Sequence, residues 1–248
     1  SSVTQPSFEE VARAAGERFA LQLYTDGDEK WVVDTAKRAA QAGAKALCLT
    51  VDVPTFGRRE RHIHRRANMA GRAFGAMRTG EAHRGRADWT LVEKLKKAVK
   101  LPLMLKGIQT AEDAELCLKY GVDIIYVSNH GGRQLDHGRG AIELLPEVIS
   151  VARGKAEFII DGGFVRGTDI LKGVARGAAM VGVGKLQALS LGAAGERGVM
   201  RMLELLETEL TVTMKLLGLR AISELDGTYL QPATPVTVPG TLSALPLL

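Results

Sequence analysis

A histidine and an arginine stand three residues apart at the end of an apolar run. The stretch YVSNHGGRQLD, residues 126–136, leads from strand-forming residues into a polar tip that holds His130 and Arg133. The two glycines between them let the backbone approach a ligand closely. An imidazole can transfer a proton near neutral pH, and a guanidinium can bind a carboxylate through two parallel hydrogen bonds. These residue types indicate proton-transfer chemistry on an anionic substrate.

A lysine and an aspartate close two other apolar runs. Lys106 ends the run LPLMLKG, and Asp52 ends the run KALCLTVD beside Pro54. A lysine that follows a buried strand needs an anion or an electron-rich partner, because unpaired charges are rarely buried. The simpler alternatives are a surface lysine at a strand end and an aspartate that serves a turn. We expect both side chains to belong to the same site as His130.

Two glycine-rich segments follow the last two apolar runs. They are DGG at 161–163 and GVGK at 182–185. Backbone N–H groups in such segments, placed at the start of a helix, can hold a phosphate. GVGK is not followed by Ser or Thr and lacks the spacing of a P-loop. A base, a guanidinium, a lysine and a phosphate cradle together suit an anionic substrate beside a phosphorylated cofactor.

The sequence indicates neither a metal centre nor a disulfide framework. His62 and His64 form an H-x-H pair, but no carboxylate or thiolate set with ligand spacing accompanies them. The two cysteines, Cys48 and Cys117, lie inside apolar runs and have the character of small buried hydrophobic residues. Buried free thiols indicate a reducing compartment, most simply the cytoplasm.

The composition is that of an ordinary globular protein. The chain has 248 residues, 46% hydrophobic and 25% charged, which is enough for one large core. No apolar run approaches the ~18 residues that a membrane helix needs, and no leader pattern is present. The chain does not begin with Met, and we expect it to be a fragment or a trimmed product.

One dense basic stretch accompanies the net charge of +5. It is GRRERHIHRR, residues 57–66. The stretch can be a solvated loop, or it can contact an anionic ligand, an anionic membrane surface or nucleic acid. Aromatic residues are only 5% of the chain and are not interleaved with the stretch, so we expect no nucleic-acid partner. The surrounding segment 53–88 is basic and Gly-rich without a strong apolar face, and we interpret it as a lid and not as a membrane anchor.

Short apolar runs alternate with amphipathic helical runs along the chain. This alternation predicts βαβ units and a parallel sheet. The runs are apolar at nearly every position, which predicts strands covered on both faces. Thr110 with Asp113 has the pattern of a helix-capping box. The predicted strands lie at 19–24, 45–52, 101–107, 122–129, 156–163 and 178–185, and the helix after the last strand is predicted from Leu186 to about Leu217.

The polar candidates all lie at the C-terminal ends of predicted strands. In a (β/α)8 barrel every strand end can contribute to the active-site rim, whereas in an open doubly wound sheet only the ends near the switch point do. Here every predicted strand contributes, which favours an α/β fold of the (β/α)8 TIM-barrel type. Six strand–helix units are recognisable, and residues 1–16 have the pattern of a strand end with its helix. We therefore expect one barrel domain over 1–248 that is N-terminally incomplete, without strand 1 and most of strand 2.

The motif SNHGGRQLD closely resembles the signature of the FMN-dependent α-hydroxy-acid oxidases and dehydrogenases, the group of glycolate oxidase, lactate oxidase and mandelate dehydrogenase. Five companions match that family in order and spacing: QLY, LTVDVPTFGRRE, LPLMLKG, DGG followed by RGTD, and the closing glycine strand. The resemblance covers roughly residues 1–225. It implies a flavin-dependent oxidation of a 2-hydroxy acid to an α-keto acid, with FMN as the cofactor.

The resemblance also implies roles on the substrate side. His130 would be the base that takes a proton from the substrate α-carbon or hydroxyl, and Asp52 would pair with its imidazole. Arg133 would hold the substrate carboxylate. Arg59 matches a second, more mobile arginine that can face the substrate. Tyr24 would hydrogen-bond the substrate oxygens.

On the cofactor side, the resemblance places Lys106 beside the flavin N1/O2 edge, where negative charge develops on reduction. The isoalloxazine would contact Gln22, Thr50 and Ser128, with Ser1 as an addition. The ribityl chain and phosphate would be held by Asp161, Gly163, Gly184 and Lys185, with Arg166 as a further candidate.

Three positions depart from the family pattern. Val165 stands where an arginine near the flavin phosphate is expected, and Arg166 follows it. Lys185 stands where arginine is usual, which replaces a planar fork by a point charge. Val3 replaces a bulky aromatic residue that some members place over the pocket, so we expect a wider pocket.

Other functions stay open at this point. One is a different FMN barrel enzyme, such as a flavin-dependent isomerase of phosphorylated substrates, although the His and Arg of HGGR argue against it. Another is a non-catalytic partial barrel that binds a ligand or a partner. The sequence does not choose between oxygen and a quinone or protein as the electron acceptor. The resemblance implies a homo-oligomer, a tetramer.

Overall fold

The computed structural model describes the whole chain except residues 17, 56, 58–86, 136, 153 and 234–248. Arg59 and most of the predicted lid at 53–88 lie outside these described residues. Among the described residues, no helix is both long and apolar enough to cross a lipid bilayer.

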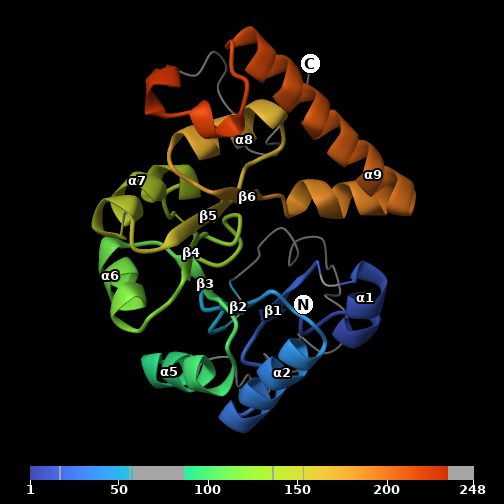
Figure 1. Ribbon diagram of the computed structural model, residues 1–248, viewed down its shortest axis with the longest axis vertical. Helices are drawn as coiled ribbons and strands as arrows, with labels where there is room; N and C mark the ends of the chain where they lie inside the picture. The colour runs from blue at the N-terminus through green and yellow to red at the C-terminus, as the bar shows by residue number, and fades with distance from the viewer. Residues whose placement is uncertain (17, 56, 58–86, 136, 153, 234–248) are drawn as a thin grey trace.

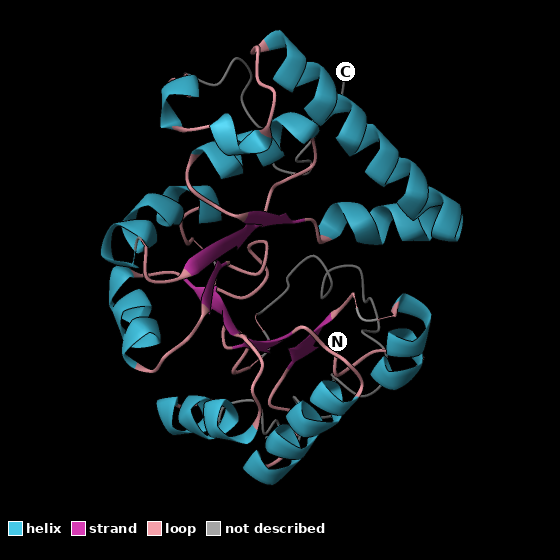
Figure 2. Ribbon diagram, in the orientation of Figure 1, coloured by secondary structure: helices cyan, strands magenta, loops and turns pink. Residues whose placement is uncertain are grey.

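Six strands form one parallel sheet within the described part of the chain. Each strand pairs with the next along the sequence, so that the order in space is β1-β2-β3-β4-β5-β6. The sheet curls, and the helices lie around its outside (Figures 1 and 2). This confirms the predicted alternation of strands and helices and the six predicted strands. The strands are β1 (Ala20–Leu23), β2 (Ala46–Thr50), β3 (Leu103–Ile108), β4 (Ile124–Val127), β5 (Glu157–Asp161) and β6 (Met180–Gly182).

The helices begin where the sequence offers side-chain caps. Asp28, Asp88 and Thr110 each accept a hydrogen bond from the backbone N–H three residues on, which satisfies a donor that the first turn leaves free. The helices are α1 (Phe8–Ala15), α2 (Glu29–Gln41), α5 (Trp89–Ala98), α6 (Ala111–Lys119), α7 (Ala141–Ala152), α8 (Gly167–Ala175) and α9 (Lys185–Leu216), followed by the short 3-10 turns η2 (Ile222–Glu224) and η3 (Gly227–Tyr229).

The helix predicted after β6 is bent. Ala194 and Gly195 have non-helical backbone angles inside α9, so that the helix runs in two directions (Figure 1). Gly195 has a φ of +58°, a conformation that glycine adopts without a steric penalty. The second half of α9 packs on α8.

The main core lies between the sheet and the surrounding helices. Alternate strand residues such as Leu21, Leu47, Leu105 and Ile125 are at most 1% exposed. The helices α2, α5, α6 and α7 cover them with small and branched side chains: Val32, Ala36, Leu91, Leu95, Ala114, Cys117, Leu145 and Val148.

The prediction that strands are covered on both faces fits β2 but not β3 or β4. All five residues of β2 are buried, whereas in β3 and β4 buried residues alternate with partly exposed ones. The partly exposed positions of β3 and β4 include Lys106 and Tyr126. One face of the sheet therefore packs on helices, and the partly exposed positions of the other face combine apolar side chains such as Met104 with the polar side chains of Lys106 and Tyr126.

Candidate active site

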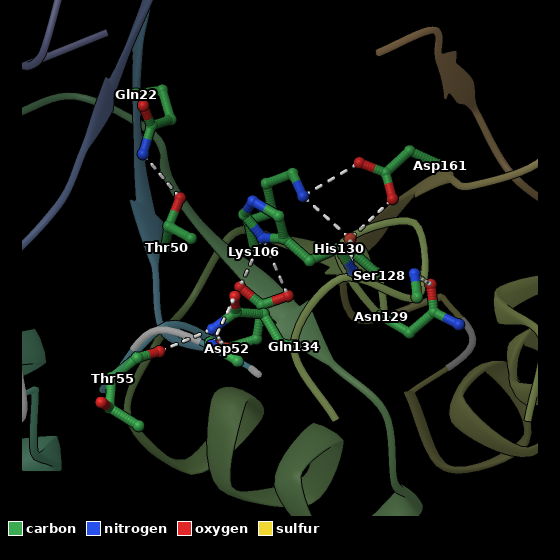
Figure 3. A network of polar contacts seen from close by, with 12 residues as sticks. Gln22, Thr50, Asp52, Thr55, Lys106, Ser128, Asn129, His130, Gln134 and Asp161 are labelled. Carbon is green, nitrogen blue, oxygen red and sulfur yellow. Dashed lines mark hydrogen bonds and ion pairs between the residues drawn. The ribbon is translucent and has the colours of Figure 1, made fainter. Parts of the chain in front are cut away.

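Polar side chains from the C-terminal ends of β2, β3, β4 and β5 meet at one edge of the sheet (Figure 3). Parallel strands bring this about because all their C-terminal ends lie at the same edge. The register places Thr50, Lys106 and Tyr126 next to one another on neighbouring strands.

His130 and Asp52 form a pair at this edge. His130 Nδ1 lies 3.1 Å from Asp52 Oδ1 and 3.3 Å from Asp52 Oδ2. The Asp52 side chain is only 4% exposed and the His130 side chain 21%. A buried carboxylate at Nδ1 orients the ring, which leaves Nε2 as the atom that can exchange a proton with a ligand. The sequence-based pairing of these two residues is seen in the geometry.

The turn that carries His130 has an unusual backbone. His130, Gly131 and Gly132 have φ values of +57°, +63° and +69°. A non-glycine residue in this conformation costs on the order of 1–3 kcal/mol, and such strain concentrates at functional sites. Asn129 holds the turn, because its Oδ1 accepts a hydrogen bond from Gly132 N at 3.1 Å and its Nδ2 donates to Arg139 O at 3.0 Å.

Lys106, Ser128 and Asp161 form a second cluster beside the histidine. Lys106 Nζ lies 2.9 Å from Asp161 Oδ2 and donates to Ser128 Oγ at 2.8 Å. Ser128 Oγ donates to Asp161 Oδ1 at 2.6 Å and accepts from His130 N at 3.0 Å. The side chains of Lys106 and Asp161 are 14% and 17% exposed. The fully buried Ser128 therefore connects the lysine–aspartate pair to the histidine turn.

Tyr126 lies under the lysine. Its ring centroid is 4.9 Å from Lys106 Nζ, a cation–π distance. Burial raises the pKa of the Tyr126 hydroxyl far above its usual value, and the negative charge of Asp161 raises it further. The Tyr126 phenol therefore stays neutral, and Lys106 forms its ion pair with Asp161.

A chain of hydrogen bonds connects Ser1 through β1 to β2. Ser1 Oγ donates to Gln22 Oε1 at 2.6 Å, and Gln22 Nε2 donates to Thr50 Oγ1 at 2.8 Å. Tyr24 follows directly after β1 at the same edge, and its backbone N donates to Ser2 Oγ at 3.1 Å. The structure therefore brings together Ser1, Gln22 and Thr50, which the sequence assigned to one ligand.

The predicted phosphate-binding residues divide into two groups. Gly163 and Gly184 lie exposed at the ends of β5 and β6, and a Cβ built at either would meet no atom within 4 Å. Lys185 Nζ donates to Gly131 O at 2.8 Å, which places this lysine next to the histidine turn. Arg166 instead points to α9, where its guanidinium lies 2.6 Å from Glu209 Oε1.

Arg133 and Tyr24 are half-buried residues of the same edge, one on the histidine turn and the other after β1. Among the described residues, no group of three or more His, Cys, Asp and Glu side chains could hold a metal ion.

Four residues of the site are not assigned from the sequence. Tyr126, Asn129 and Gln134 lie inside the stretch YVSNHGGRQLD, and Gly107 follows Lys106. Gly107 sits where the register between β3 and β4 shifts, and a Cβ there would lie 2.5 Å from Asp52 Cβ. The only signal for these four in the sequence is that each lies close to an assigned residue along the chain.

Comparisons with known proteins agree with this geometry. The family model for FMN-dependent dehydrogenases matches residues 1–232. The chain is 39% identical to glycolate oxidase 3 of Arabidopsis thaliana over 98% of its own length and 71% of that relative. It is 36% identical to an L-lactate oxidase of a Nostoc species over 93% of its own length and 70% of that relative.

Solved structures of mandelate oxidase share the fold. One with benzoyl-formic acid has a TM-score of 0.78 at 38% identity, and a variant with a monooxide FMN adduct has a TM-score of 0.76 at 38% identity. These alignments cover 88% and 89% of this chain and 64% and 65% of the solved chains, so the chain spans less than two thirds of their length. The chain belongs to the family of FMN-dependent dehydrogenases that contains the 2-hydroxy-acid oxidases, and its curled parallel sheet is part of their (β/α)8 barrel.

Proposed function

We propose that the protein oxidises an α-hydroxy acid to an α-keto acid, with FMN as its cofactor. The observation that carries this proposal is the His130–Asp52 pair beside the Lys106–Ser128–Asp161 cluster at one sheet edge. The first provides a base oriented by a buried carboxylate, and the second a fixed positive charge. The activity is a proposal for the whole protein, because the chain spans only part of its solved relatives.

The residues at the edge fit a flavin. An isoalloxazine ring offers carbonyl and ring-nitrogen atoms, and Gln22, Thr50 and Lys106 are amide, hydroxyl and ammonium groups suited to them. Gly163 and Gly184 leave open space next to backbone N–H groups at the approach to α8 and α9, as a phosphate needs. When bound, FMN supplies the two-electron acceptor that oxidation of the substrate requires.

On the substrate side, His130 takes a proton from the substrate hydroxyl or α-carbon at Nε2, because Nδ1 faces Asp52. The Asp52 carboxylate stabilises the resulting imidazolium. Arg133 binds the substrate carboxylate through a bidentate pair, and the Tyr24 hydroxyl bonds a substrate oxygen. Arg59 stays a prediction for a second arginine that faces the substrate.

On the cofactor side, Lys106 would lie beside the flavin N1/O2 edge, where its positive charge would stabilise negative charge. Ser1, Gln22, Thr50 and Ser128 would contact the ring or hold its contacts in place. Lys185 and the backbone of Gly163 and Gly184 would bind the phosphate, and Asp161 would bind the ribityl chain. Arg166 is a further candidate for the same phosphate, but its ion pair with Glu209 supports a structural role at the start of α8.

Acceptor, assembly and compartment are also part of the proposal. The relatives are named oxidases, which supports oxygen as the electron acceptor over a quinone or protein. We propose a single domain over 1–248 and a homotetramer on the family resemblance. The free, buried thiols of Cys48 and Cys117 support a reducing compartment such as the cytoplasm, although one relative is named as peroxisomal.

The test is the colour of the protein and its response to substrate. The purified full-length protein should be yellow and should bleach anaerobically with one member of a panel of glycolate, lactate and mandelate. Readmitting oxygen should restore the colour if oxygen is the acceptor, and an added dye should do so otherwise. A yellow protein that no member of the panel bleaches would contradict the proposal.

A further inference from the structure

The segment that carries Asp52 has no regular structure of its own. It begins where β2 ends at Thr50, and its described residues up to Gly57 belong to neither a helix nor a strand. Asp52 must nevertheless stay within hydrogen-bond distance of His130, on a different loop. Contacts to other parts of the chain must therefore set the position of this segment.

Gln134 makes such contacts with one side-chain amide. Its Nε2 donates to Thr55 O at 2.7 Å and to Asp52 O at 3.3 Å, and its Oε1 accepts from Gly57 N at 3.4 Å. Figure 3 shows Gln134 between Asp52 and Thr55. The single amide of Gln134 thus forms hydrogen bonds with two carbonyl groups and one N–H group of the same segment.

The two loops also touch through their backbones. A Cβ at Gly57 would lie 2.4 Å from Gln134 O and 2.6 Å from Arg133 O. On the other side, a Cβ at Gly107 would lie 2.5 Å from Asp52 Cβ and 2.7 Å from Asp52 Cγ. Asp52 is therefore confined between Gly107, where the register of β3 shifts, and the loop that contains Gln134.

We propose that Gln134 is the positioning residue of the His130–Asp52 pair. Gln134 lies four positions after His130 on the same turn, so this turn presents the imidazole and also holds the backbone of its carboxylate partner. Loss of the amide lets the carboxylate move relative to the ring, while the substrate and flavin contacts stay in place. The expected effect on the reduction rate rests on the proposed function, whereas the expected movement of Asp52 relative to His130 does not.

The test compares Gln134→Leu with the matched control Gln41→Leu in the full-length protein. Gln41 is an exposed residue at the end of α2, remote from the sheet edge. We expect Gln134→Leu to slow anaerobic flavin reduction at saturating substrate by about 10- to 100-fold, because small misplacements of catalytic groups have effects of this order. The KM for the hydroxy acid and the flavin content should change by less than about threefold, a split that loss of folding would not produce.

A second readout does not depend on catalysis. The imidazole N–H that faces Asp52 should give a low-field proton resonance, assigned by its loss in His130→Gln. We expect this resonance to shift or disappear in Gln134→Leu and to stay in Gln41→Leu. Gly57→Ala, which forces the same loops apart and keeps Gln134, should act in the same direction.

The outcomes separate the two proposals. An unchanged resonance in Gln134→Leu, or reduction within about threefold of the parent with unchanged KM, would overturn the positioning role. If no hydroxy acid reduces the parent protein but the resonance still responds to Gln134→Leu, the positioning of the pair stands and the proposed function fails.

Discussion

At the scale of single residues, the proposed base and the proposed positive charge of the site contact different carboxylates. His130 is held by Asp52, and Lys106 forms an ion pair with Asp161. Ser128 lies between the two pairs and bonds to parts of both. Because His130 and Lys106 contact different carboxylates, the proposed role of each can be tested by its own substitution.

His130→Gln should keep flavin and lose turnover. Removal of a positioned base typically costs ~10²–10⁴-fold in rate, and glutamine cannot accept the proton. Flavin content and anaerobic reduction rate are measured on the same preparation. Reduction within about threefold of the parent would remove His130 from the role of base.

Lys106→Met should weaken binding of sulfite, a probe that places negative charge at the flavin N1/O2 edge. The physical reason is loss of the positive charge from a site where it acts mainly on the anionic state. The change also leaves Asp161 without its counter-charge, so the melting temperature should fall.

The double variant Lys106→Met with Asp161→Asn is the control for stability. It should regain much of the melting temperature, because the unpaired buried carboxylate is gone, but not the sulfite affinity. Unchanged sulfite affinity in Lys106→Met would place the lysine away from that edge.

At the scale of elements, close backbone approaches set how α8 sits in the fold. A Cβ at Gly167, the first residue of α8, would lie 2.6 Å from Leu210 N and 2.7 Å from Leu206 O of α9. Gly167 N also donates to Glu209 Oε2 at 2.7 Å. The start of α8 therefore rests on the backbone of α9, and Glu209 binds both this N–H and Arg166.

Gly167→Ala should lower the free energy of unfolding. Alanine favours a helix over glycine by ~1 kcal/mol, but overpacking against a backbone typically costs ~1–3 kcal/mol, and the clash should decide the sign. Chemical denaturation of the variant measures the change.

Gly138→Ala is the matched control, because a Cβ there meets no atom within 4 Å. Its unfolding free energy should stay within about 0.5 kcal/mol of the parent, as for an ordinary surface substitution. Equal effects of the two substitutions would show that α8 does not approach α9 this closely.

At the scale of the whole molecule, one main core joins the strands β1 to β5 to the helices α2, α5, α6 and α7. A smaller cluster of Leu171, Ala175, Leu219 and Leu225 joins α8 to the segment after α9. The two cysteines are buried in different elements, Cys48 in β2 and Cys117 in α6. Burial raises the pKa of both thiols to about 12.

Neither cysteine should react with iodoacetamide in the native protein at pH 8. With a pKa near 12, roughly one thiol in 10⁴ is ionised there, and only the thiolate is the nucleophile. Raising urea should expose both at the same concentration if the proposed single domain unfolds cooperatively. Mass spectrometry of each peptide along the titration provides the measurement, and two separate midpoints would contradict a single cooperative unit.

The sequence by itself determined the order of the elements and the edge at which the chemistry gathers. The alternation of apolar runs and helical runs is local information, and parallel pairing then brings all strand ends to one edge. For this reason Asp52, Lys106, His130 and Asp161 could be assigned to one site from the sequence. The family motif added the roles proposed for them, and the structure shows the contact that the motif implies between His130 and Asp52.

Apart from the His130–Asp52 pair, which the family resemblance implies, only the tertiary structure decided which residues of the site contact each other. The pairing of Lys106 with Asp161, the attachment of Arg166 to Glu209 and the hold of Gln134 on Thr55 depend on strand register, a bulge at Gly107 and the packing of α8 on α9. These features arise from contacts between segments far apart in the chain. Local propensity and residue type do not encode them, because the same side chains can find other partners until the backbone is placed.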